Sequence, residues 1–188
     1  FGLQLNHSFD KLLGVNTLTV GSEYISEDVM DEISAYYYLV DLSVNNLGYF
    51  VQSDWFLTDN LNLLSGLRVD KNSLLDHSVF NPRFSLLYNL YKRTQFRCSY
   101  STGFRAPQAF DTDLHTAFAG GGVSRIVLAE DLKEERSSSY TTSINYDKAS
   151  ERYVYGFTLE MFYTRLLDVF YQEYSGEDEY GQIFVKKN

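Results

Sequence analysis

The chain has 188 residues and a formal net charge of −9 at pH 7. This acidic charge argues against nucleic acid as a partner, because nucleic acids select basic surfaces. The single Cys excludes both an internal disulfide framework and a Cys-based zinc site. The 16 Tyr and 14 Phe, set against only 2 Pro, favour β structure, since aromatic side chains suit a pleated surface. The length suggests one domain, covering residues 1–188, and no apolar run is long enough for a membrane helix.

Apolar and polar residues alternate in one segment after another along the chain. This two-residue period predicts about nine strands, each roughly ten residues long. In chain order they cover residues 1–9, 15–24, 47–57, 61–70, 83–90, 94–102, 134–147, 153–163 and 181–187.

The connections between these strands alternate between short and long. The short ones are expected at residues 10–13, 58–60, 91–93 and 147–150, and the long ones at 26–46, 71–80, 103–133 and 173–180. In an up-and-down antiparallel sheet, this alternation gathers every long loop at one end. Short turns at one end and long loops at the other are typical of an outer-membrane β-barrel. A soluble β-sandwich also alternates apolar and polar residues, but it seldom sorts its loops in this way.

The two faces of the predicted strands differ in the same sense. Arg68, Asp70, Arg97 and Glu160 fall on the polar face, as expected for a wet lumen, and the other face carries Leu, Val, Tyr and Phe, as expected for lipid. Aromatic residues near strand ends either form girdles at the lipid–water boundary or simply pack across neighbouring strands. These residues are Tyr24, Tyr49, Trp55, Tyr100, Tyr146, Tyr153 and Tyr163.

About nine strands do not close a wide barrel. An open sheet edge cannot face lipid, because its backbone groups would go without hydrogen bonds. We therefore expect the functional protein to extend beyond both Phe1 and Asn188.

Several motifs, in a fixed order, carry a family resemblance. NPRFSLLYNL (81–90), RTQFRCSYSTGFRAPQAFDTDLH (93–115) and DLKEERSSSYTTSINY (131–146) resemble the barrel portion of TonB-dependent outer-membrane receptors. TLTVGSEY (17–24), GYFVQSDWFLTDNLNLLSGLRVD (48–70) and LEMFYTRLLDVF (159–170) fit the same family. The chain departs from the family pattern around the Leu-Lys pair, where Glu130, Asp131 and Glu134 replace the usual Asn and prolines.

The resemblance implies a fragment of an all-β, antiparallel transmembrane barrel of 22 strands with a plugged lumen. It implies a location in the outer membrane of a Gram-negative bacterium and contact with outer-membrane lipid. The ligand would be a ferric siderophore or, alternatively, cobalamin or haem. The TonB complex would supply energy through an N-terminal plug domain that this chain lacks, as it lacks the C-terminal strand of the family. The resemblance implies binding and gating, with no catalysis and no cofactor.

Two motifs are the candidate functional residues. We expect them to hold a long outer loop, with Arg105 pairing either with Asp111 or Asp113 in the loop or with Glu134 or Glu135 across the strands. Gly103 would permit a turn and Pro107 would end the strand ladder. The motifs are Gly103, Phe104, Arg105, Ala106 and Pro107, and Leu132, Lys133, Glu134 and Glu135. Asp113, His115 and Arg125 are candidates for ligand-facing positions in the outer loops.

Two other functional classes stay open. An outer-membrane enzyme would need Asp113 and His115 to meet a loop serine, but their spacing carries no catalytic signature. A soluble carbohydrate-binding sandwich would use the aromatic residues as sugar platforms. Three scattered histidines, His7, His77 and His115, lack the spacing of a metal site, so no metal is expected.

Overall fold

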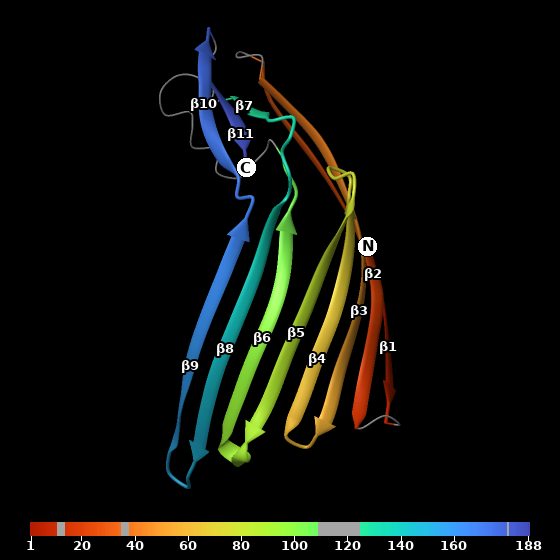
Figure 1. Cartoon of the computed structure of the whole chain (residues 1–188), viewed down its shortest axis with the longest axis vertical. Coiled ribbons are helices and arrows are strands. Elements are labelled where there is room, and N and C mark those ends of the chain that lie inside the picture. The colour runs from red at the N-terminus through yellow and green to blue at the C-terminus, as the bar shows by residue number, and fades with distance from the viewer. Residues whose placement is uncertain (11–13, 35–37, 109–124, 180) are drawn as a thin grey trace.

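The computed structural model describes residues 1–10, 14–34, 38–108, 125–179 and 181–188, and Figure 1 shows the arrangement of their strands. No helix in these ranges is both long and apolar enough to cross a membrane. The strands are β1 (Gly2–Phe9), β2 (Val15–Ile33), β3 (Tyr38–Thr58), β4 (Leu61–Asn72), β5 (Ser78–Leu90), β6 (Thr94–Arg105), β7 (Arg125–Leu128), β8 (Glu135–Ala149), β9 (Val154–Leu167), β10 (Tyr171–Asp178) and β11 (Gly181–Lys187). A short 3₁₀ helix, η2 (Tyr91–Arg93), joins β5 to β6.

Eight strands form one antiparallel sheet, which we name the wall sheet. Its order is β1-β2-β3-β4-β5-β6-β8-β9, so each strand pairs with the next wall strand along the chain. The short turns between β3 and β4, β5 and β6, and β8 and β9 gather at one end of the sheet, and the longer connections leave from the other end (Figure 1). We name this second end the rim. The wall sheet confirms the predicted all-β, up-and-down barrel fragment, whose sheet is not closed.

The segment at 26–46 was predicted as a long loop, but its described residues up to Ile33 and from Tyr38 onwards extend two strands. β2 and β3 stay paired without a break in register from Val15↔Phe56 to Ile33↔Tyr38. The pairing with β4 begins only at Asn46, so the upper part of this hairpin has lost its neighbour on that side. Neither face of a free ribbon has to be buried. The sequence therefore needs no apolar–polar alternation there, and the periodicity failed to mark the strands.

The last predicted wall strand, 181–187, belongs to a different sheet. β11 pairs with β10 on one side and with β7 on the other, which gives a second sheet of three strands, the small sheet, beside the rim (Figure 1). The predicted loop at 173–180 is therefore wrong too, because β10 occupies most of it. Alternation identified residues 181–187 as a strand, but alternation says nothing about which strand is the partner.

Cross-strand register confirms the assignment of the two faces. Residues directly opposite each other on neighbouring strands share a face of the sheet. Phe50, Arg68 and Asn81 are opposite one another on β3, β4 and β5, and Arg97, Ser143 and Glu160 are opposite one another on β6, β8 and β9. Asn81 and Arg83 are two residues apart on β5 and therefore share a face. Arg83 lies opposite Ser101, which shares its face of β6 with Arg97, so the two sets lie on a single polar face. Exposed apolar side chains such as Leu5, Val51, Phe84 and Met161 cover the opposite face.

Charged residues bound the apolar face on β8. Arg136 and Lys148 lie on that face at the two ends of the strand, with Tyr140, Ile144 and Tyr146 between them. Residues 136 to 148 span about 40 Å along a strand, or about 30 Å along the membrane normal at a tilt near 40°. This height matches the hydrocarbon thickness of a bilayer.

Aromatic rings on the apolar face contact one another across strands. The Tyr100 and Tyr140 ring centroids lie 4.9 Å apart, those of Tyr140 and Tyr163 6.4 Å apart, and those of Tyr146 and Phe157 5.8 Å apart. Cross-strand packing therefore accounts for Tyr100, Tyr146 and Tyr163. Their arrangement in two rows, one towards each end of the strands, is also what an aromatic girdle requires.

Candidate functional site at the rim

The GFRAP motif lies where β6 reaches the rim. β6 continues through Arg105, with Gly103 opposite Ser137 and Arg105 opposite Glu135. The predicted turn at Gly103 is therefore wrong: among the described glycines, a positive φ occurs only at Gly14, Gly176 and Gly181. The strand ends after Arg105, and Pro107 is buried just beyond the end, as expected for a residue that cannot donate to the ladder.

Arg105 forms a cross-strand ion pair with Glu135, one of the partners expected for it. Its Nε lies 2.7 Å from Oε2 of Glu135, and the Glu135 side chain is only 15% exposed. The alternative partners, Asp111 and Asp113, lie outside the described residues. A guanidinium paired with a half-buried carboxylate has a fixed orientation, so the arginine can hold a further group in place.

That further group is Phe170, which follows β9. Its backbone N–H donates to the other carboxylate oxygen of Glu135 at 2.5 Å. Its ring lies 5.0 Å below the guanidinium carbon of Arg105 and 4.9 Å from Nζ of Lys186, both within cation–π range. Lys186 also donates to the backbone carbonyl of Gln108 at 3.0 Å. We name these five residues, Arg105, Gln108, Glu135, Phe170 and Lys186, the rim cluster.

The second motif contributes a separate set of contacts. Glu134 is buried, and one of its oxygens lies 3.2 Å from Nε2 of His77 and 3.6 Å from Nε of Arg136. His77 comes from the β4–β5 connection and also contacts Asp76 at 2.8 Å. The hydrogen bond with Asp76, followed by the one with Glu134, raises the pKa of His77 above its ordinary value. The His77 ring therefore joins the β4–β5 connection to the start of β8.

Lys133, also in the second motif, bonds to the last residue of the chain. Its backbone N–H donates to Asn188 Oδ1 at 2.9 Å, and its carbonyl accepts from Asn188 Nδ2 at 3.0 Å. The same Nδ2 reaches the carbonyl of Asp168 at 2.7 Å. The segment before β8 is thus joined both to the end of the small sheet and to the exit of β9.

The predicted ligand-facing residues are not brought together among the described residues. Asp113 and His115 lie outside them. Arg125 opens β7, where its backbone pairs with Ile183 of β11. The described part of the chain contains no group of three or more His, Cys, Asp or Glu side chains arranged to hold a metal ion.

A polar network on the lumen face was not predicted as a unit. The carboxylate of Asp70 is 2% exposed and accepts from Arg68 Nε at 2.9 Å, from Asn46 Nδ2 at 2.9 Å and from Asn81 Nδ2 at 3.3 Å. Arg68 also pairs with Glu23 at 2.9 Å. We name Glu23, Asn46, Arg68, Asp70 and Asn81 the wall network. The spacing Arg68-x-Asp70 indicated a shared face, but their partners come from β2, β3 and β5 and left no local signal.

The glycine opposite Asp70 makes room for this network. A Cβ on Gly48 would lie 2.4 Å from an Arg68 guanidinium nitrogen and 2.8 Å from an Asp70 oxygen. The absence of a side chain at Gly48 therefore lets the guanidinium lie flat across β3.

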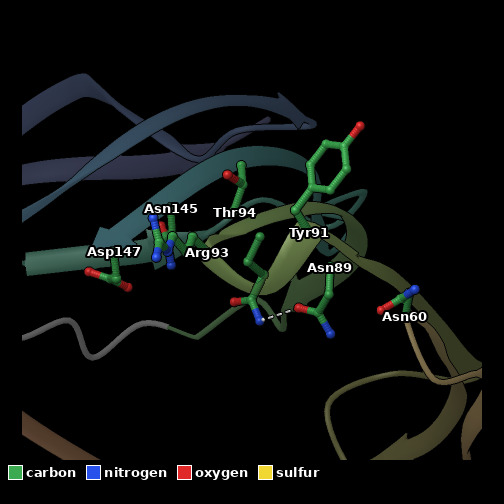
Figure 2. A pocket seen from close by; sticks show the side chains of 8 residues that line it. Asn60, Asn89, Tyr91, Arg93, Thr94, Asn145 and Asp147 are labelled. Atoms are coloured by element: carbon green, nitrogen blue, oxygen red, sulfur yellow. Dashed lines mark hydrogen bonds between the residues drawn. The ribbon is translucent and has the colours of Figure 1, made fainter. Parts of the chain in front are cut away.

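A cavity of about 640 Å³ lies at the opposite end of the wall sheet. It is lined mainly by carboxamides and hydroxyls, with one cation and one carboxylate (Figure 2), and Gln95 Nε2 donates a hydrogen bond to Asn89 Oδ1 at 3.1 Å. Its lining residues are Asn60, Asn89, Tyr91, Arg93, Thr94, Gln95, Asn145 and Asp147.

Comparison with known proteins agrees with this geometry. Residues 1–185 match the family described as TonB dependent receptor-like, beta-barrel. The chain belongs to the TonB-dependent receptor β-barrel family. Members of this family lie in the outer membrane of Gram-negative bacteria, and the chain is an outer-membrane barrel segment. Its polar face is the lumen face and its apolar face meets lipid.

Individual relatives fit the family assignment. Over 101 residues, which are 54% of this chain and 15% of the relative, it is 32% identical to the iron-regulated outer membrane virulence protein of Vibrio cholerae. The siderophore receptor PirA of Pseudomonas aeruginosa has the same fold, with a TM-score of 0.79 at 19% identity, over 100% of this chain and 36% of that one. The copper transporter OprC also matches, with a TM-score of 0.66 at 14% identity, over 100% of this chain and 32% of that one. The chain thus spans about a third of the solved structures that it matches.

Proposed function

We propose that the receptor containing this chain takes up a ferric siderophore across the outer membrane, with energy supplied by the TonB complex through the plug domain. The observation that carries the proposal is the family match over residues 1–185. It is supported by the iron-regulated relative, which is 32% identical to this chain over 101 residues. Siderophore receptors among the similar structures support the same cargo class. Because a copper transporter shares the fold, the cargo has to be tested directly.

In this proposal the two sequence motifs hold the outer segments around the ligand entrance. Gly103, Phe104, Arg105, Ala106 and Pro107 bring β6 to the rim, and Leu132, Lys133, Glu134 and Glu135 lead the chain back into β8. The ion pair between Arg105 and Glu135 joins the two motifs at their meeting point. Asp113, His115 and Arg125 lie between the motifs in sequence, and we propose them as contacts of the ligand.

A growth experiment tests the cargo. A strain lacking the whole receptor gene is grown with iron supplied as a siderophore complex, with haem as the iron source, or under a requirement for cobalamin. The proposal expects a growth defect on at least one ferric siderophore, such as ferric enterobactin, that the intact gene restores. Normal growth on every siderophore complex together with a defect on haem or cobalamin would transfer the assignment to that ligand.

The energy source is tested in the same strains. Deleting the gene for TonB should abolish uptake of radioactive iron supplied as the siderophore complex, while binding of that complex to intact cells remains. Uptake that continues without TonB would contradict energisation by that complex.

A further inference from the structure

Two outer segments that lie far apart in sequence share the small sheet. β7, in the connection between β6 and β8, pairs in parallel with β11, which follows β9, through Ile183↔Arg125, Phe184↔Ile126, Val185↔Val127 and Lys186↔Leu128. The N–H of Ala129 also donates to the carbonyl of Lys186 at 3.0 Å. The two connections that leave the rim on either side of β8 are thus joined by a backbone ladder.

Lys186 links this sheet to the wall sheet. Lys186 is 3% exposed although it carries an ammonium group, and a buried charge is costly unless polar groups surround it. Its Nζ donates to the carbonyl of Gln108, three residues past the end of β6, and lies over the ring of Phe170 at the exit of β9. One side chain of β11 therefore contacts the exits of two wall strands.

Phe170 carries the contact on to the wall sheet. Its ring is shared by the cations of Lys186 and Arg105, and its N–H is held by Glu135. Arg105 and Glu135 are the last and first residues of adjacent wall strands. The chain of contacts thus runs from the wall ladder through Phe170 to β11, and from β11 through its backbone pairs to β7.

We propose that Lys186 and Phe170 are positioning residues that make the two outer segments a single body fixed to the rim. A displacement of the segment that follows β9 then displaces β7 as well, so a ligand that touches either segment acts on both. This last consequence rests on the proposed function, because it requires cargo to arrive at the rim. The coupling itself is independent of the identity of the cargo.

The test is hydrogen exchange in the full-length receptor without ligand. Lys186→Met keeps a long side chain but removes both the hydrogen bond to Gln108 and the cation over Phe170. We expect the amides of β7 and β11 both to exchange faster, by about tenfold, because the contacts that hold the small sheet to the wall sheet are lost. Lys186→Arg, which keeps the cation and its donors, should restore most of the protection.

Lys187→Met is the matched control. Its ammonium pairs with Glu173 inside the small sheet, and no contact among the described residues joins it to Gln108 or Phe170. The control should leave exchange in β7 close to that of the unmodified receptor. If Lys186→Met prevents assembly, Phe170→Leu tests the same contact by removing the ring instead of the cation.

Two outcomes would overturn the proposal. In one, exchange accelerates in β11 while β7 keeps its protection. In the other, Lys187→Met has the same effect as Lys186→Met. Neither outcome bears on siderophore uptake, which the growth experiment decides separately.

Discussion

The wall network and the rim cluster are both built on an arginine and a carboxylate of the lumen face, yet they connect different things. In the wall network, Arg68 and Asp70 join strands that the backbone ladder has already placed side by side. In the rim cluster, Arg105 and Glu135 reach Phe170 and Lys186, which lie beyond the ends of the wall strands. Position along a strand therefore decides the role of an ion pair.

Burial separates the two further. The Asp70 side chain is 3% exposed and has donors on both oxygens, whereas the Glu135 side chain is 15% exposed and its partner Arg105 46%. An exposed pair gains little because water and salt screen it. Removing one member of a buried pair costs far more free energy, because the remaining charge or donors stay buried without a partner. We therefore expect changes in the wall network to affect the stability of the whole barrel, and changes in the rim cluster to act locally.

Among single substitutions, Asp70→Ala in the full-length receptor should have the largest effect. It removes the acceptor shared by Arg68, Asn46 and Asn81. The free energy of unfolding should fall by about 3 kcal/mol, because buried amide donors lose their acceptor, as measured by urea unfolding in detergent. The double variant Arg68→Met with Asp70→Leu leaves no buried charge and should cost less. A single variant as stable as the unmodified receptor would contradict the importance of the network.

Gly48→Ala should have the next largest effect. The new Cβ would come within 2.8 Å of both Arg68 and Asp70 and force the guanidinium away. Such crowding costs about 1–3 kcal/mol, in the same unfolding measurement. Gly2→Ala on β1 is the control, because its Cβ would meet only the Ser22 carbonyl, at an ordinary 3.7 Å. Equal unfolding midpoints for the two variants would show that the space at Gly48 is not required.

Glu135→Gln tests the rim cluster. The amide keeps the size of the side chain but loses the charge that pairs with Arg105. We expect a loss of about 1 kcal/mol, confined to the rim, so limited proteolysis should cleave near Phe170 faster while global unfolding hardly changes. Glu160→Gln, on the same face but away from the rim, should leave cleavage unchanged. Loss of global stability equal to that of Asp70→Ala would remove the distinction between the two sites.

The smallest expected effect is a pH dependence of the His77 contact. The raised pKa of His77 means that the folded protein holds this proton more tightly than the unfolded chain does. The stabilisation is complete below the ordinary imidazole pKa of about 6.5 and is lost as pH rises through the raised value. Amide exchange in residues 73–77, compared with that of His77→Gln at each pH, should show extra protection on the acidic side only. A constant ratio between the two proteins would contradict this link.

The wall could be predicted because its two faces meet different solvents. Lipid on one side and the lumen on the other force an alternation that the sequence displays, as in Tyr153 to Tyr163 of the β9 region. The β2–β3 extension beyond Tyr24 has no such contrast and was missed. The pairing of Arg105 with Glu135 was predictable because both lie at the ends of adjacent strands. Phe170 and Lys186 were not, since their roles depend on where the small sheet packs.

The parallel pairing of β7 with β11 also has a consequence for the order of assembly. Parallel strands cannot be joined by a tight turn. Arg125 pairs with Ile183, and β8, β9 and β10 lie between these two residues in sequence, so this pairing can form only after all three strands are available. Loop closure over such a separation is slow compared with hairpin formation. The wall hairpins can therefore form early, and the surface outside the rim is completed late. A receptor caught midway would be a membrane-inserted wall whose entrance is still unfinished.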